Sequence, residues 1–439
     1  MNADLSSLLA VGAFAITVAV TALVLLVRGD LAPAGLRPMA LSVGGRFLLG
    51  GALGLGVIAF SIKVAIILTL SSFPGKTIEP LIAGVGSQDG RDQPPLPRPD
   101  PKPYEWQSLP TVVPAPADNP TTPAKVALGE RLFHDPLLSR DRTVSCASCH
   151  DMAGGSGTDG RATAIGIDGI VGKRNSPTVW NAAFQARLFW DGRAGSLEEQ
   201  AKGPPLNPDE MGMPSFAAIE ERIAQEADYA PLFHAAFGAD AAITMDRIAQ
   251  AIAAYERTLV AADSAYDRFV SGDSQALSPR QQRGMWLFQS SGCIMCHAGP
   301  NFSGASLVGP RNPYAPLFAK RSAVAISHGL DRETAPRGVW RIPSLRNVAL
   351  TAPYFHNGSV SDLREAVRVM ATAQLNATLV STTQQPAQPR WDAEAKRFLP
   401  PEQRLVLGED DVEDIARFLE SLSSDTLSAR IKMAAGERR

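Results

Sequence analysis

The sequence has few of the residues that most often ligate metals, and it has no excess of charge of either sign. Only four cysteines and six histidines occur among 439 residues, and 42 lysines and arginines nearly balance 44 aspartates and glutamates. The net charge of −2 argues against a protein that binds nucleic acid through a basic surface. Long runs with the alternation of β-strands are also missing. With 45% hydrophobic and 20% charged residues, the chain is predicted to be globular and largely helical, with room for two or three domains.

All four cysteines lie in two short motifs, CASCH at 146–150 and CIMCH at 293–297. This pattern is typical of covalent attachment of a c-type haem. Two thiols one helical turn apart can add to the two vinyl groups of one haem, and the histidine that follows can ligate the iron. The predicted haem-binding residues are Cys146, Cys149 and His150 for the first haem, and Cys293, Cys296 and His297 for the second.

A redox-active cysteine pair and a zinc site are the alternative interpretations of these motifs. A single zinc site would have to bring together cysteine pairs that begin at positions 146 and 293. It also gives no reason for a histidine after each pair. Two haems are therefore the favoured interpretation, and they leave no thiol for a disulfide.

The N-terminal region contains two apolar runs, at 5–27 and 47–73. The first run has no charged residue, and the second has only Lys63; each is long enough to cross a bilayer. Three arginines between them favour the cytoplasmic side for this loop. Residues 1–73 are therefore predicted to form a hairpin of two transmembrane helices in a bacterial inner membrane, with the rest of the chain in the periplasm. A cleaved signal peptide at 1–30 is the alternative.

The remaining sequence divides by composition. Residues 74–122 are rich in proline and are predicted to form a stiff periplasmic tether. Apolar spacing then predicts helices at 123–133, 215–228, 230–238, 245–260, 278–289 and 410–424. Because a helix precedes each cysteine motif, the fold class is predicted to be all-α with two cytochrome c-like domains. The predicted boundaries are 123–262 for the first domain, 278–425 for the second, and 426–439 for a C-terminal tail.

Eight longer segments, within about 120–425, resemble the bacterial dihaem cytochrome c peroxidases and the related methylamine-utilisation (MauG-type) enzymes. The segments are TVSCASCH (143–150), RNSPTVWNAAF (174–184), FWDGRA (189–194), EQAKGP (199–204), DEMGM (209–213), GCIMCH (292–297), RIPSLRNVALTAPYFHNGSV (341–360) and REAVRVM (364–370). The resemblance implies reduction of hydrogen peroxide to water at the first haem. It implies that the second haem accepts the electrons, and that the protein is a homodimer.

The same resemblance implies roles for single residues. Met370 matches the sixth ligand of the second iron, which suits a closed electron-transfer haem. Trp190 matches a tryptophan that relays electrons between the haems, and Glu210 matches a distal carboxylate that transfers protons. The residues that match a calcium site between the domains are Asn175, Thr351 and Pro353. His356 matches a histidine near the second haem and is expected either to be structural or to support a ligand of that haem. The histidines at 134, 234 and 328 are not expected to bind iron.

One position departs from the pattern. Many of these peroxidases have a histidine in the loop after the first haem motif, where it closes the resting peroxidatic iron; here Ile167 occupies that place. The first haem is therefore predicted to be open. MauG-type enzymes share an open first site, but they have a tyrosine where this chain has Met370.

Three functions are compatible with these features of the sequence. The first is a peroxidase that takes electrons from a small cytochrome, a cupredoxin or a membrane donor. The second is a MauG-type oxidase that modifies a protein or an organic substrate. The third is an electron carrier without catalytic activity, which the missing histidine disfavours.

Overall fold

The computed structural model describes residues 104–310, 312–315, 323–331, 339–375, 377–381, 391–392, 397–398 and 406–437. All of them belong to a single unit, Leu96–Arg439. The transmembrane hairpin predicted for 1–73 and the tether up to residue 103 lie outside the described residues. Among the residues that the structure does describe, no helix is both long and apolar enough to cross a membrane.

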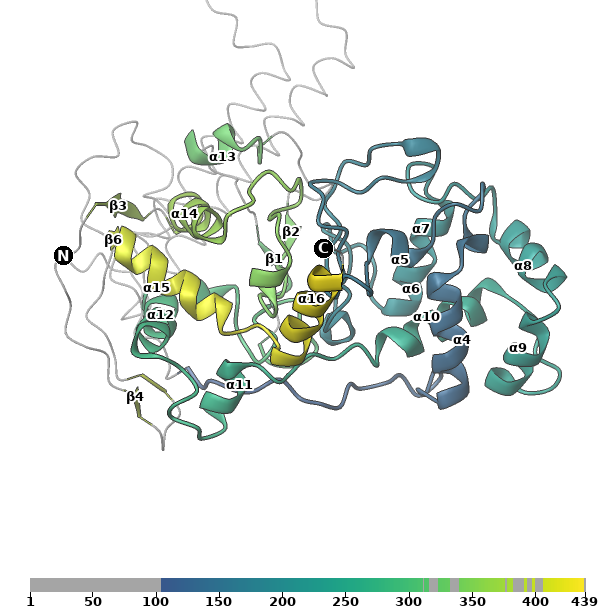
Figure 1. Cartoon of the computed structure of the whole chain (residues 1–439), viewed down its shortest axis with the longest axis horizontal. Coiled ribbons are helices and arrows are strands. Elements are labelled where there is room, and N and C mark those ends of the chain that lie inside the picture. Colours follow the sequence, from purple (N-terminus) through teal and green to yellow (C-terminus); the bar gives the residue numbers. More distant parts are fainter. Residues whose placement is uncertain are drawn as a thin grey trace, which may run out of the picture. The chain divides into compact units, whose positions relative to one another are not determined.

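Helices dominate the part of the chain that carries the first cysteine motif (Figure 1). Several of them begin after a capping side chain; the Thr122 hydroxyl, for example, accepts a hydrogen bond from the backbone N–H of Lys125, and Pro123 occupies the first helical position. The α-helices are α4 (Pro123–His134), α5 (Cys146–Cys149), α6 (Leu197–Ala201), α7 (Gly203–Leu206), α8 (Phe216–Gln225), α9 (Tyr229–Phe237) and α10 (Met245–Glu256), and the 3-10 turns are η1 (Pro136–Leu138), η2 (Ile167–Gly169) and η3 (Ala182–Phe184).

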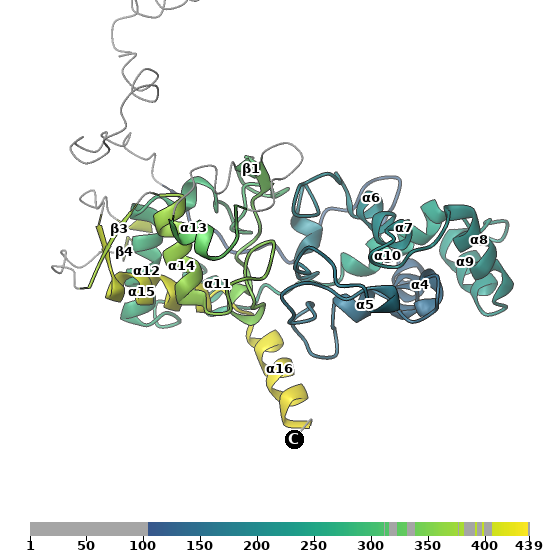
Figure 2. The same ribbon diagram turned by 90° about the horizontal axis from the view of Figure 1, so that it is seen from above.

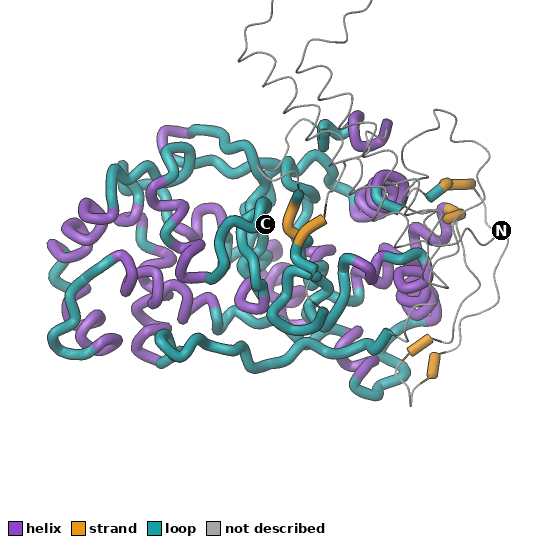
Figure 3. The backbone as a smooth tube through the Cα atoms, turned by 180° about the vertical axis from the view of Figure 1, so that it is seen from behind, coloured by secondary structure: helices purple, strands orange, loops and turns teal. Residues whose placement is uncertain are grey.

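The second part repeats this plan with other helices and a few very short strands. Figure 3 shows how short the strands are, and how much of the backbone is loop. The helices are α11 (Ala265–Val270), α12 (Pro279–Ser290), α13 (Ala323–Ser327), α14 (Leu363–Ala373), α15 (Glu409–Glu420) and α16 (Asp425–Glu437), with η4 (Cys293–Met295) and η5 (Val348–Leu350). The paired strands are β1 (Tyr314–Ala315) with β2 (Trp340–Arg341), β3 (Thr378–Val380) with β6 (Val406–Gly408), and β4 (Trp391–Asp392) with β5 (Arg397–Phe398).

The first core forms where α4 crosses α10. Gly129 of α4 lies so close to α10 that a Cβ atom there would overlap the carbonyl oxygen of Ala251. Leu128, Leu132 and Ile248 are fully buried around this crossing. The absence of a side chain at Gly129 thus lets the two backbones approach, so that the flanking apolar residues are removed from water.

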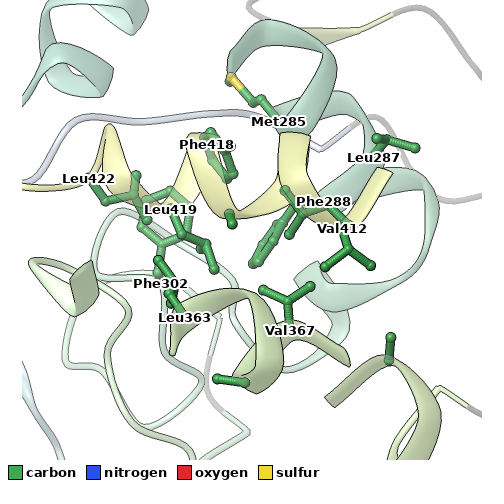
Figure 4. Packing of buried hydrophobic residues seen from close by; sticks show 14 of the residues in the cluster. Met285, Leu287, Phe288, Phe302, Leu363, Val367, Val412, Phe418, Leu419 and Leu422 are labelled. Carbon is green, nitrogen blue, oxygen red and sulfur yellow. The ribbon is translucent and has the colours of Figure 1, made fainter. Parts of the chain in front are cut away.

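The second core forms in the same way where α12 crosses α15. A Cβ atom at Gly284 would overlap the carbonyl oxygen of Asp414. Beside the crossing, Phe288 and Phe418 pack with their ring centroids 5.5 Å apart, and Val367 of α14 closes the core from below (Figure 4). The described fold is mostly helical, and the predicted helices are confirmed. Their predicted ranges were 123–133, 215–228, 230–238, 245–260, 278–289 and 410–424.

The ends of the described chain do not follow the predicted division. In the proline-rich segment, Trp106 is 1% exposed and belongs to the second core, so this part is packed and not a free tether. The segment predicted as a tail forms α16, and Leu427 on this helix is buried. The domain boundaries at 262 and 278 themselves stay predictions.

Candidate haem sites

Each cysteine motif forms one helical turn that ends at its histidine. In the first motif the backbone N–H of His150 donates to the carbonyl of Cys146, at 2.9 Å. In the second motif the N–H of His297 donates to the carbonyl of Cys293, also at 2.9 Å. The two cysteines of each pair therefore lie on the same turn, and no disulfide joins any of the four.

Both histidines are held in the form that ligates iron. The Nδ1 atom of His150 lies 3.3 Å from the carbonyl oxygen of Gly157, and the Nδ1 atom of His297 lies 3.1 Å from that of Phe302. Since a carbonyl oxygen can only accept, Nδ1 carries the proton and Nε2 keeps its lone pair. Burial lowers the pKa of His150, and it lowers the pKa of His297 to about 4, so both rings stay neutral.

The thiols lie in surroundings that suit thioether bonds and not thiolates. Burial raises the pKa of Cys146 to about 12 and that of Cys149 to about 11, and it also raises the pKa of Cys296. Zinc sites and redox-active pairs depend on thiolates, whose pKa values are lowered. Across the described ranges, no three His, Cys, Asp or Glu side chains gather closely enough to hold a metal ion. The zinc alternative thus finds no support, and the residues present fit a covalently attached haem.

Met370 lies on α14 and faces the second core. Its side chain is partly buried and packs against the same core as Cys293 and Phe302, the residue whose carbonyl holds His297. Ligation of the second iron by Met370 stays a prediction. The packing nevertheless brings the methionine and the second haem motif to one core.

Glu210 is held in a tight turn beside the first haem motif. Three successive backbone N–H groups, from Glu210 to Gly212, donate to the carbonyl of Asn207 at 3.1, 3.1 and 2.8 Å. The Asn207 side-chain amide also donates to Oε1 of Glu210, at 2.7 Å. Met211, the residue after Glu210, is buried in the first core, and Cys146 packs against the same core, so this turn lies on the core that carries the first haem motif.

The surroundings of Glu210 favour its protonated form relative to an exposed glutamate. Burial raises the pKa of this carboxyl group, and the hydrogen bond from Asn207 partly offsets that increase. A carboxyl group that is perturbed in this way beside a cofactor site is a candidate for proton transfer. Asn207 was not among the predicted site residues, although the sequence N-P-D at 207–209 is typical of a turn.

Ile167 is buried in the first core, where its side chain is only 1% exposed. Its backbone N–H donates to the carbonyl of Glu210 at 2.9 Å, and a Cβ atom at Gly166 would overlap the carbonyl of Asp209. The loop after the first haem motif is therefore fixed against the turn of Glu210. Within this loop, the structure places the aliphatic side chain of Ile167 in the first core.

Trp190 lies where the first part of the chain meets the second. Its indole N–H donates to the backbone carbonyl of Asn175 at 2.8 Å, and its own carbonyl accepts from the N–H of Arg341 at 2.8 Å. The Trp190 ring stands edge-on to His356, with centroids 6.4 Å apart, and His356 stacks on Trp340 at 4.3 Å. These aromatic rings form a continuous group at the junction, of which the sequence analysis missed Trp340.

The predicted calcium-site residues are partly brought together. The side-chain amide of Asn175 donates to the carbonyl of Pro353 at 3.1 Å, whereas the Thr351 hydroxyl donates to the carbonyl of Val348.

His134 lies against the carbonyl of Glu130, and His328 lies 3.2 Å from a carboxylate oxygen of Glu365. A cavity of about 580 Å³ is lined by Lys173, Ser327, His328, Gly329, His356, Asn357 and Ser359.

The helical fold and the two C-x-x-C-H motifs define the class of c-type cytochromes, with one motif packed against each of two helical cores. The family described as di-haem cytochrome c peroxidase matches residues 123–275. The chain is 40% identical over 304 residues to the cytochrome c551 peroxidase of Pseudomonas aeruginosa, a match that covers 67% of this chain and 78% of that protein. The chain therefore belongs to the dihaem cytochrome c peroxidase family, whose members carry two c-type haems.

Two further comparisons extend this result. Cytochrome c peroxidase Ccp of Escherichia coli K12 is 41% identical over 271 residues, which cover 61% of this chain but only 57% of that longer protein. The crystal structure of a MauG-like protein associated with microbial copper homeostasis aligns with a TM-score of 0.57 and 30% identity. That alignment covers 77% of this chain and 99% of the MauG-like protein. The fold is thus shared between the peroxidase and MauG-like branches of the family.

Proposed function

We propose that this protein is a dihaem peroxidase that reduces hydrogen peroxide to water with electrons from a small redox protein. The overall reaction consumes one peroxide, two protons and two electrons and releases two waters. The observation that supports the proposal is the turn of Glu210, in which Asn207 holds a carboxyl group with a raised pKa on the same core as the first haem motif. The peroxidase names of relatives with about 40% identity support the same activity.

The two haem sites would be held by different sets of residues. Cys146 and Cys149 would attach the first haem, and His150 would ligate its iron. The second haem would be attached by the cysteines of CIMCH and ligated by His297 and Met370. Bound haem supplies the redox chemistry, while the protein controls ligation, proton supply and access.

Glu210 would act on the protons of peroxide. Its carboxylate can accept the proton of one peroxide oxygen and then donate that proton to the other oxygen, which leaves as water. Asn207 fixes the carboxyl group for this transfer through the 2.7 Å hydrogen bond to Oε1. Ile167 cannot ligate iron and its side chain is buried in the first core, so this residue would not close the first haem.

Trp190 would lie on the electron path between the haems. Its hydrogen bonds reach Asn175 in the first part of the chain and Arg341 in the second. Calcium bound at Asn175, Thr351 and Pro353 would support this junction, because amide and carbonyl oxygens suit that ion. The hydrogen bond from the Asn175 amide to the Pro353 carbonyl brings two of these three residues together.

The remaining features of the proposal concern location and assembly. The apolar runs within 1–73 would anchor the protein in the inner membrane, with the haem domains in the periplasm and the lipid bilayer as a partner. The electron donor would be a cytochrome, a cupredoxin or a membrane component. We further propose a homodimer, as the family resemblance implies.

A MauG-type oxidase that modifies a protein or an organic substrate is the second candidate. The absence of a histidine in the loop of Ile167 and the alignment with a MauG-like structure favour it. Met370 favours the peroxidase, because MauG-type enzymes have a tyrosine at this position.

Steady-state assays separate these functions. The purified holoprotein is mixed with hydrogen peroxide and a reduced cytochrome or cupredoxin, and the oxidised resting spectrum is recorded beside the assay. A peroxidase with an open first haem gives fast turnover and one high-spin haem. Slow turnover with a long-lived oxidised state supports the MauG-type reaction. Two low-spin haems without turnover would leave only an electron carrier.

A further inference from the structure

The C-terminal helix α16 follows the second core but contacts the loop of the first haem motif. Arg430 donates from Nη2 to the carbonyl of Met152 at 3.3 Å, and its guanidinium group lies 5.8 Å from the centre of the Trp180 ring. Next to it, Ile431 lies over Gly155, where an added Cβ atom would be 2.6 Å from Cγ1 of Ile431. Two adjacent residues of α16 thus cover residues 152–155.

This loop also holds the first proximal histidine. The carbonyl of Gly157, two residues after Gly155, accepts the hydrogen bond of His150 Nδ1. Side chains that follow in the sequence also hold the loop: the Trp180 indole N–H donates to the carbonyl of Gly155 at 2.9 Å, and the Thr178 hydroxyl donates to that of Ser156 at 2.8 Å. The Gly157 carbonyl therefore lies on a loop that α16 covers from the second domain.

The start of α16 is firmly attached to the second half of the chain. Leu427 is 2% exposed, and the N–H of Thr426 donates to Oδ2 of Asp263 at 3.0 Å. Asp425 forms an ion pair with Arg268 at 2.5 Å. Because the helix is fixed at its first turn, its contacts with residues 152–155 occur at a defined position. The end of the helix points away from the other elements, and Met433 is 61% exposed (Figure 2).

The second haem motif shows the complementary arrangement. Its proximal histidine, His297, is held by the carbonyl of Phe302. The Tyr104 hydroxyl accepts a hydrogen bond from the N–H of Gly299 at 2.8 Å, and Trp106 packs 6.1 Å from the Phe302 ring. Each proximal loop is thus supported by a segment from the opposite end of the described chain.

We propose that α16 is a positioning element for the first haem, in which Arg430 and Ile431 hold the loop that orients His150. The inference rests on the proposed role of His150 as proximal ligand. A histidine whose Nδ1–H donates to a fixed carbonyl keeps its ring orientation and its basicity. Through α16, the second domain would therefore influence the ligand strength at the peroxidatic iron without contacting it.

The test uses the full-length holoprotein with the double substitution Arg430→Ala and Ile431→Ala. Amide hydrogen exchange of residues 152–158 is measured by mass spectrometry, and the iron–histidine stretching band of the first haem by resonance Raman spectroscopy. We expect exchange in 152–158 to become at least about tenfold faster and the band to shift. Exchange in 298–304 stays unchanged. Met433→Ala, on the same helix but exposed, is the matched control and leaves both readouts as in the parent.

A second variant approaches the contact from the loop. Gly155→Ala puts a methyl group against Ile431 at a backbone φ of +92°, so it should release α16 and reproduce the faster exchange. Unchanged exchange and an unchanged stretching band in the double variant, with normal haem content, would overturn the inference. A parent protein without peroxide turnover would instead refute the proposed function, and it would leave the exchange result standing.

Discussion

Replacement of Glu210 by glutamine tests the proposed proton transfer with little change in shape. Glutamine keeps an oxygen at Oε1, so it can still accept the hydrogen bond from Asn207, which is 2.7 Å in the parent. The substitution removes only the ability to accept and return a proton. We therefore expect the turn at 207–213 and the content of both haems to be preserved.

The size of the effect follows from the role. A positioned general acid–base group contributes about 10²- to 10⁴-fold to a rate. We expect kcat/KM for hydrogen peroxide to fall within this range in Glu210→Gln, as measured by steady-state oxidation of a reduced donor. Asp209→Asn is the matched control, because its carboxyl group is exposed and one residue away. A Glu210→Gln enzyme within about threefold of the parent would refute the proton-transfer role.

The pH dependence provides a second check on the same residue. Burial raises the pKa of Glu210, so the ionised form that accepts a proton appears at higher pH than for an exposed glutamate. The activity of the parent should therefore rise with pH through this pKa, and the rise should be absent in Glu210→Gln. Asn207→Ala should move the rise to still higher pH, since the Asn207 amide stabilises the carboxylate.

Three further predictions concern stability and electron transfer. Burial raises the pKa of Glu256 from 4.5 to about 8, so between these pH values the native state holds a proton that the unfolded state releases, and the stability of the parent falls as pH rises. Glu256→Gln should therefore be more stable than the parent at pH 9 by a few kcal/mol in urea unfolding, with a smaller difference at pH 5. Gly284→Ala should lower the thermal midpoint through a loss of about 1–3 kcal/mol at the α12–α15 crossing, whereas Gly436→Ala, which has open space, should not. Trp190→Phe loses the hydrogen bond to Asn175 and should slow electron transfer between the haems in stopped-flow experiments, with haem content unchanged.

Much of the helical framework could be predicted because its signals are local. Thr122 and Pro123 mark the start of α4, and apolar spacing marks the face that α10 buries. The turn at each candidate haem site could also be predicted, since the spacing of each motif closes one turn with its histidine at the end. The structure adds the acceptor carbonyls of Gly157 and Phe302, which fix the two rings.

The features that could not be predicted depend on contacts between distant residues. The proline-rich composition around Trp106 predicted an extended tether. The Trp106 side chain instead packs in the second core, where its large apolar surface is removed from water. Similarly, nothing near Gly129 in the sequence shows that α10 must pass within a distance that excludes a side chain. Local sequence patterns therefore predict the helices, whereas the contacts between distant residues depend on how the helices pack.

The two ends of the described chain, the segment of Tyr104 and Trp106 and helix α16, each contact a haem-motif loop in the other part of the chain. A division at 262–278 gives each part a cysteine motif, a helix crossing and a core. The same division separates residues 152–155 from Arg430 and Ile431, and it separates Gly299 from Tyr104. Each part would therefore keep its haem-binding residues but lose one support of its proximal loop. The two haem sites are thus independent in sequence and interdependent in structure, which suits a reaction in which an electron accepted at one haem is used at the other.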